Sequence, residues 1–234
     1  MISFRFDRIL SFTLGSWPFI VSLNRYDSKF KRYIHSCGGI IINRYQIVTA
    51  GHCFERQSSP QDWIIIAGRN DIYIPEIHKS PITDRLHNTN TLENVYLPKE
   101  IIVHGGHRKD GEVNDISMII LKKPLKLDDK TMTSIKLASN TPKSNDNCKV
   151  AGWGATNDHT GILSSYPCQL HEAKVKIRNF QECRVNYFVF HARQKSVENF
   201  SDLRNYNAKD LAFDVQDQQN FCAGGDKSDS CSVR

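Results

Sequence analysis

A histidine and an aspartate stand where they could share a proton-transfer role. His52 lies just beyond an apolar run that ends at Val48, and Cys53 follows it directly. Asp115 precedes the apolar run 116–121, so its carboxylate is expected at the mouth of a buried strand, where it needs hydrogen-bond donors. An imidazole N–H is a suitable donor. The pair predicts general acid–base chemistry, whereas a lone His-Cys would be read as a half-buried histidine beside a structural disulfide.

Short strands separated by polar turns are expected to position these two residues. Apolar or alternating runs predict strands at 17–23, 33–42, 46–50, 63–67, 94–103, 116–121, 148–152 and 172–177. We expect a turn at 24–31, an enlarged surface loop at 71–91 and a polar connector at 122–147. Many short strands with few helical patterns predict an all-β barrel or sandwich.

Six segments of the chain resemble motifs of the trypsin/chymotrypsin-like serine proteases, and they occur in the same order as in that family. They span the region from residue 15 to residue 231, which is most of the chain. The segments are Gly15-Ser16-Trp17-Pro18 with the strand after it, Cys37-Gly38-Gly39, Thr49-Ala50-Gly51-His52-Cys53, Asn114-Asp115-Ile116, Cys148-Lys149-Val150-Ala151-Gly152-Trp153-Gly154, and Phe221-Cys222-Ala223-Gly224-Gly225 with Asp229-Ser230-Cys231.

The resemblance implies a specific architecture and reaction. The fold would be all-β, with two antiparallel barrels of the six-stranded type, over 15–125 and 148–234, joined by a connector at 126–147. The implied activity is peptide-bond hydrolysis without a cofactor, with His52 and Asp115 as the first two members of a His-Asp-Ser triad. Gly51 replaces the alanine usual in the family, and we expect it to loosen the backbone slightly and to do little more.

The nucleophile departs from the family pattern. In the family the cysteine matching Cys231 is followed by Gly-Asp-Ser-Gly-Gly-Pro, which holds the attacking serine. Here the sequence continues as Ser232-Val233-Arg234. We therefore expect a truncated second barrel and an inactive 234-residue chain that lacks the nucleophile, although the family is enzymatic.

Asp229 is the expected substrate-binding residue. It stands two residues before Cys231, where trypsin-like members carry an aspartate at the base of the primary specificity pocket. The resemblance therefore implies cleavage after Arg or Lys. The alternative for Asp229 is an exposed acidic residue in a polar tail.

Seven cysteines indicate an oxidising compartment, and the expected localisation is extracellular. The resemblance implies disulfides between Cys37 and Cys53 and between Cys183 and Cys222. It leaves three cysteines without partners in the sequence present, namely Cys148, Cys168 and Cys231.

Composition argues against other classes of function. The net charge is +6 but its lysines and arginines are scattered, so nucleic-acid binding is not expected. The longest apolar region, residues 9–23, is too short to span a membrane and overlaps the expected first strand. His104 and His107 form the only close histidine pair, but two intervening glycines argue for a flexible loop, and no metal site is expected.

Two functional hypotheses remain. The first is a trypsin-like endopeptidase, with protein or peptide substrates and protease inhibitors as partners and a monomeric state. The alternative is a non-catalytic homologue that acts as a binding or decoy module. The identities retained at His52, Asp115 and Asp229 favour the first, because a binding module has no chemical need of them.

Overall fold

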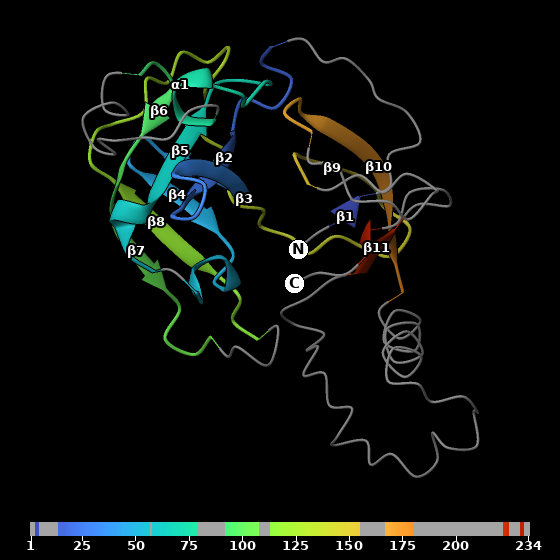
Figure 1. Ribbon diagram of the computed structural model, residues 1–234. Helices are drawn as coiled ribbons and strands as arrows, with labels where there is room; N and C mark the ends of the chain where they lie inside the picture. The colour runs from blue at the N-terminus through green and yellow to red at the C-terminus, as the bar shows by residue number, and fades with distance from the viewer. Residues whose placement is uncertain are drawn as a thin grey trace, which may run out of the picture.

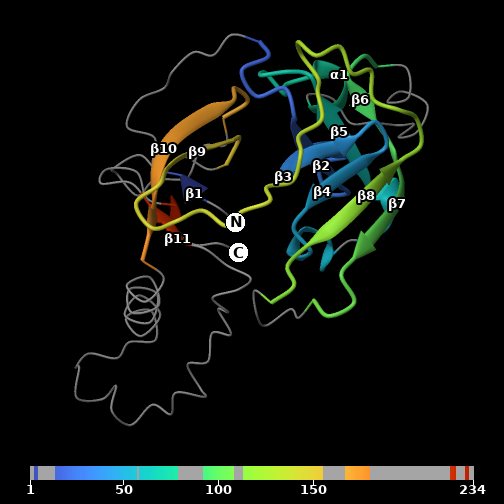
Figure 2. The ribbon, with the colours of Figure 1, turned by 180° about the vertical axis from the view of Figure 1, so that it is seen from behind.

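Two β-sheets dominate the computed structural model, and they lie side by side in both ribbon views (Figures 1 and 2). A short antiparallel pair, β1 (Ser3–Phe4) with β12 (Ser230–Cys231), is also present. The predicted all-β class is confirmed, since the helical elements in the described part of the chain are short. The structure describes residues 3–4, 14–56, 58–78, 92–107, 113–154, 167–179, 222–224 and 230–231.

In the described part of the chain, the first sheet has seven strands in the order β6-β5-β2-β3-β4-β8-β7. Its two edges, β6 and β7, are consecutive in the chain and are separated only by Leu97. The strand expected over 94–103 is therefore broken in two, and its halves form opposite edges of a nearly closed barrel. The strands are β2 (Ile20–Asp27), β3 (Arg32–Asn43), β4 (Gln46–Thr49), β5 (Trp63–Ala67), β6 (Val95–Tyr96), β7 (Pro98–Val103) and β8 (Ser117–Leu121).

The first strand differs from its prediction at both ends. It begins at Ile20 rather than at residue 17, and the backbone N–H of Ile20 donates to the Trp17 carbonyl across a turn. It also continues to Asp27, because Arg25 to Asp27 pair in register with β3. The expected turn at 24–31 was therefore too long, since cross-strand pairing extends the hairpin through polar residues that local composition assigns to a turn.

The inside of the first sheet is closely packed. Gly39 lies between neighbouring strands, where an added Cβ would come within 2.9 Å of side-chain atoms of Ile47 and Leu23. A larger residue would not fit there without displacing core side chains. The buried residues of this inner core are Val21, Leu23, Ile41, Ile47, Phe54, Trp63, Ile65, Ala67, Tyr96, Ile119, Leu121, Leu125 and Met132.

The segment expected as a connector belongs partly to this core. Leu125 and Met132 are buried among its side chains. The backbone N–H groups of Thr133 and Ile135 donate to carbonyls of Pro18 and Ile41, respectively. The chain after β8 is thus fastened along the first sheet before it enters the second.

Among the described residues, the second sheet comprises three antiparallel strands in the order β11-β10-β9. Buried and more exposed residues alternate along β10, as the period-2 pattern of 172–177 predicted. Its strands are β9 (Asn147–Gly152), β10 (His171–Arg178) and β11 (Cys222–Gly224).

A second core joins the two sheets. Trp153 and Leu170, which flank the described part of the second sheet, are buried against Ile64 and Ile66 on the outer face of β5. The Trp153 Nε1–H donates to the Asn70 carbonyl at 2.9 Å. The seam between the sheets is therefore an apolar, hydrogen-bonded contact.

The long loop predicted at 71–91 lies partly outside the described residues. Its first part contains the single helical turn α1 (Pro75–His78), which low periodicity did not reveal. Two short 3-10 helices, η1 (His52–Phe54) and η2 (Pro60–Asp62), complete the described elements. The first of these carries His52.

Candidate active site

His52 begins η1, directly after the end of β4. The Thr49 hydroxyl donates to the Gly38 carbonyl at 2.7 Å, which fastens the end of β4 to β3. Two residues after His52, the ring of Phe54 is buried and packs edge-on against Trp63, with 4.9 Å between centroids. The histidine backbone is therefore held from both sides by the first sheet.

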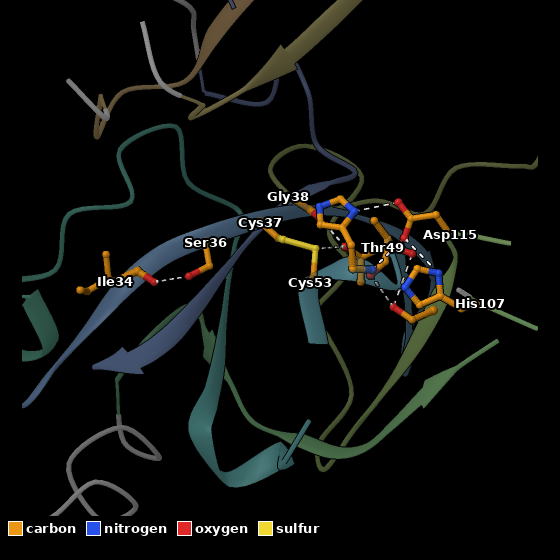
Figure 3. The surroundings of a disulfide bond; sticks show 11 residues. Ile34, Ser36, Cys37, Gly38, Thr49, Cys53, His107 and Asp115 are labelled. Carbon is orange, nitrogen blue, oxygen red and sulfur yellow. Dashed lines mark hydrogen bonds and ion pairs between the residues drawn. A yellow bond between two sulfur atoms is a disulfide. The ribbon is translucent and has the colours of Figure 1, made fainter. Parts of the chain in front are cut away.

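A disulfide adds a covalent support. Cys37 of β3 is bonded to Cys53, the residue after the histidine, as predicted (Figure 3). The bond closes a segment with a sequence separation of 16 residues. Such a cross-link restricts the unfolded chain and so stabilises the folded one, by about 3 kcal/mol for a loop of this size.

Asp115 stands two residues before the start of β8, which pairs with β4. The Ser117 hydroxyl donates to the Ala50 carbonyl at 2.9 Å, and Ser117 is directly opposite Thr49 in the sheet. The preceding residue, Asn114, has a left-handed backbone with φ of 54°, a conformation that asparagine tolerates better than most residues. This turn brings the carboxylate to the end of β4 where His52 lies.

The structure brings His52 and Asp115 together through two hydrogen bonds. The His52 backbone N–H donates to Asp115 Oδ1 at 2.7 Å, and the ring Nδ1 lies 2.7 Å from Asp115 Oδ2. An ionised carboxylate only accepts hydrogen bonds, so Nδ1 must carry the hydrogen. In the neutral ring this leaves the Nε2 lone pair free to accept a proton.

The surroundings favour an ionised Asp115. Burial alone would raise the pKa of this carboxyl. The hydrogen bonds from the His52 ring and backbone, together with the positive charges that His52 and His107 can carry, outweigh burial and lower the pKa below its ordinary value. The aspartate can therefore remain an anion while the ring gains and loses a proton.

Two residues beside this pair, His107 and Glu55, were not assigned to it from the sequence. His107 has a side chain only 6% exposed, and its Nδ1 lies 3.9 Å from Asp115 Oδ1. Its Nε2 lies 3.1 Å from Glu55 Oε1. An added Cβ on Gly51 would lie 3.1 Å from the His107 ring. The expectation that Gly51 does little more than loosen the backbone was therefore wrong, because its missing side chain makes room for the ring.

The other predicted site residues are less well defined. Asp229 and Cys183 lie outside the described residues, while Cys222 and Cys231 are described only as backbone in β11 and β12. Cys148 is half-buried and Cys168 is exposed, and both are free thiols. Partial covering of the Cys168 thiol raises its pKa, and the nearby Asp71 carboxylate adds to this effect. Neither free thiol takes part in the hydrogen bonds between His52 and Asp115.

Among the described residues, one group of three side chains has the spacing of a metal site, namely Cys37, His52 and Cys53. Its two sulfurs form the disulfide, so they are not thiolate ligands. In the described part of the chain no helix is long and apolar enough to cross a membrane.

Comparisons with known proteins give further context for this arrangement. A sequence model of the trypsin family matches residues 10–232. Serine protease 28 of Mus musculus is 27% identical over 175 residues, covering 74% of this chain and 57% of the mouse protein. Trypsin eta of Drosophila melanogaster is 27% identical over 171 residues, covering 73% of this chain and 57% of the fly protein. The chain thus spans about 57% of the length of these two curated relatives.

A solved structure has a similar fold. Neuropsin, a serine protease expressed in the limbic system of mouse brain, matches with a TM-score of 0.56 and 21% sequence identity. The match covers 75% of this chain and 66% of neuropsin. At this identity the likeness concerns the fold.

Proposed function

Because the chain belongs to the trypsin family, we propose that it represents a serine endopeptidase in which His52 is the general base and Asp115 orients it. The observation that carries the proposal is the pair of 2.7 Å hydrogen bonds from the His52 ring and backbone to one carboxylate. They supply the tautomer and the fixed orientation that a base in acyl transfer requires.

The proposed reaction uses the His52 ring twice. Its Nε2 accepts the proton of a serine hydroxyl as the oxygen attacks the scissile carbonyl, and the same nitrogen then returns the proton to the leaving amine. Asp115 remains ionised and stabilises the imidazolium formed between these steps. The lowered pKa of Asp115 supports this role, because a protonated carboxyl would offer no charge stabilisation.

The serine is the part of the triad that we place by family order. In relatives it belongs to the Gly-Asp-Ser-Gly-Gly-Pro motif after the cysteine matching Cys231, where this sequence has Ser232-Val233-Arg234. We propose that turnover requires this motif, because it supplies the attacking serine. The motif also supplies backbone N–H groups for the oxyanion.

Asp229 is proposed to select basic substrates. Its place two residues before Cys231 supports a carboxylate at the base of the primary specificity pocket, which would pair with Arg or Lys before the cleaved bond. We expect Asp229→Ser to abolish the preference for a basic residue while leaving the triad chemistry intact.

Secretion is proposed from the redox chemistry of the site. The disulfide beside His52 needs an oxidising compartment to form and persist. The proposed partners are protein substrates and protease inhibitors encountered outside the cell, and the proposed state is a monomer.

The first experiment is to sequence the native transcript across the Arg234 codon and to express its longest product. We expect a message that encodes the serine motif and a product that cleaves fluorogenic arginyl and lysyl peptides. Asp115→Asn should lower kcat by about 10,000-fold, because the ring loses its tautomer and its counter-ion. Glu100→Gln on the exposed part of β7 is the matched control and should leave kcat unchanged.

Two results would contradict the proposal. One is that every message ends at Arg234, which would favour the binding-module alternative. The other is a serine-bearing product that neither cleaves peptides nor reacts with a sulfonyl fluoride.

A further inference from the structure

A second histidine is built into the surroundings of the His52–Asp115 pair. His107 lies on the loop between β7 and β8, and its backbone N–H donates to the His104 carbonyl at 2.9 Å. Asn114, the neighbour of Asp115, holds the same loop by donating its side-chain N–H to the Gly106 carbonyl at 3.2 Å. The ring of His107 is thereby placed beside Asp115 (Figure 3).

The position of the His107 ring depends on the absence of a side chain at Gly51. A Cβ at Gly51 would lie 3.1 Å from Cγ and 3.2 Å from Cδ2 of His107, and 3.3 Å from Asp115 Oδ1. Contacts this short would push the ring or the carboxylate away by a few tenths of an ångström. The glycine before His52 therefore allows the imidazole and the carboxylate to approach each other.

Both ring nitrogens of His107 face carboxylate oxygens. Nε2 lies 3.1 Å from Glu55 Oε1, and because a carboxylate only accepts, this nitrogen carries a hydrogen. Nδ1 lies 3.9 Å from Asp115 Oδ1 and makes no hydrogen bond among the described residues. A ring protonated at both nitrogens would attract both carboxylates across these distances.

We infer that His107 is a positioning residue for the His52–Asp115 pair. Its ring, seated between Glu55 and Asp115 in the space left by Gly51, holds the Asp115 carboxylate in the ionised form that accepts both bonds from His52. Where it concerns catalysis, this inference rests on the proposed function. An apolar packing role would require the ring but would be indifferent to its nitrogens.

The test is a titration of Asp115 in the full 234-residue chain, followed by the carboxyl carbon in NMR. Replacing His107 with glutamine removes the imidazole ring with both of its nitrogens but keeps a polar group that can reach Glu55. We expect the Asp115 pKa to move up, towards its ordinary value. His104→Gln is the matched control, because His104 is an exposed histidine on the same loop, and it should leave the titration unchanged.

Gly51→Ala probes the same contact without removing the histidine. The added methyl group should displace the ring and also move the Asp115 pKa up. In a chain that already carries His107→Gln, the alanine should have a much smaller effect, because the ring it displaces is gone. Amide-exchange protection of Ile119 in β8 shows in each variant that the first sheet is folded.

An unchanged Asp115 titration in folded His107→Gln would overturn the inference. So would equal effects of Gly51→Ala with and without the His107 ring. The titration needs no turnover, so it stands even if the protein proves not to be a peptidase. In an active serine-bearing product, His107→Gln should lower kcat several-fold with KM unchanged, whereas a loss confined to KM would contradict a role in positioning the pair.

Discussion

The two sheets of the molecule bury their strands in different ways. In β5 of the first sheet all five residues are buried, because Trp63, Ile65 and Ala67 face the inner core while Ile64 and Ile66 face the second core, between the sheets. In β10 of the second sheet burial alternates, and Lys174 and Lys176 are exposed. A strand packed on both faces has little freedom to shift. The candidate site lies on the sheet of the first kind.

The first sheet positions the candidate catalytic pair, and the second sheet packs against the first. The elements that position His52 and Asp115 all belong to the first sheet and to the turns that follow β4 and precede β8. The second sheet contacts the first through Trp153 and through the hydrogen bond that Trp17 donates to Glu172 at 2.9 Å. We therefore expect perturbations of the first sheet to be felt at the site.

The largest expected contrast comes from matched core truncations. Ile65→Ala in the inner core should lower the free energy of unfolding by about 4 kcal/mol, because a fully buried side chain leaves a cavity that dense packing cannot fill. Ile177→Ala in β10, whose side chain is 3% exposed, should cost about 2 kcal/mol. Urea unfolding measures both, and equal losses would remove the distinction between the sheets.

A smaller effect is expected from the cysteines. Replacing Cys37 and Cys53 together with serine should lower the free energy of unfolding by about 3 kcal/mol, since the cross-link no longer restricts the unfolded chain. Replacing the free thiols Cys148 and Cys168 is the control and should cost less than about 1 kcal/mol. Comparable losses for the two pairs would contradict a special role of the disulfide in the first sheet.

The smallest effect concerns pH and the seam between the sheets. His35 of β3 packs edge-on against Trp153 and its Nδ1 lies 2.7 Å from the Ser22 hydroxyl. Burial, with a smaller contribution from the charge of His78, lowers the pKa of His35 from 6.5 to about 4. Above pH 6.5 the His35 ring is neutral in both the folded and the unfolded chain, so its lowered pKa does not change the free energy of unfolding there. As the pH falls towards 4, the unfolded chain takes up a proton that the folded chain refuses, and stability is lost.

We expect this loss to be about 2 kcal/mol, after allowing for partial exposure of the ring. Urea unfolding of the wild type and of His35→Gln, near neutral pH and again just above the lowered pKa, isolates the contribution. The variant should lose less stability on acidification. Identical pH dependence in the two proteins would show that His35 is protonated as readily in the folded chain as in the unfolded one.

The sequence predicted best what depends on buried apolar runs. The run 63–67 and the run after Asp115 are continuous stretches of large apolar residues, and both are strands at close to the predicted bounds. The break at Leu97 and the extension of β2 to Asp27 were not predicted, because they are decided by partner strands distant in the sequence. Pairing between distant strands cannot be inferred from the composition of one segment.

The site shows the same limit. His52 and Asp115 were found because each stands at the end of an apolar run, but His107 was read as part of a flexible glycine loop. The signal that would have placed it is the hairpin: Val103 of β7 pairs with Ser117 of β8, so the loop between them returns to the end of the sheet where Asp115 lies. Glu55 had no such signal, since only the turn of η1 brings it to the ring.

Trp153 gives the molecule a spectroscopic reporter. The chain has three tryptophans, and they lie in different surroundings: Trp63 in the inner core, Trp17 at the bond to Glu172, and Trp153 in the seam. Separation of the sheets would transfer the Trp153 indole to water while Trp63 stayed enclosed. The fluorescence emission of Trp153 would then shift to longer wavelength before the far-ultraviolet circular dichroism of the strands changed. Separation of the two sheets could therefore be followed by intrinsic fluorescence, without an added label.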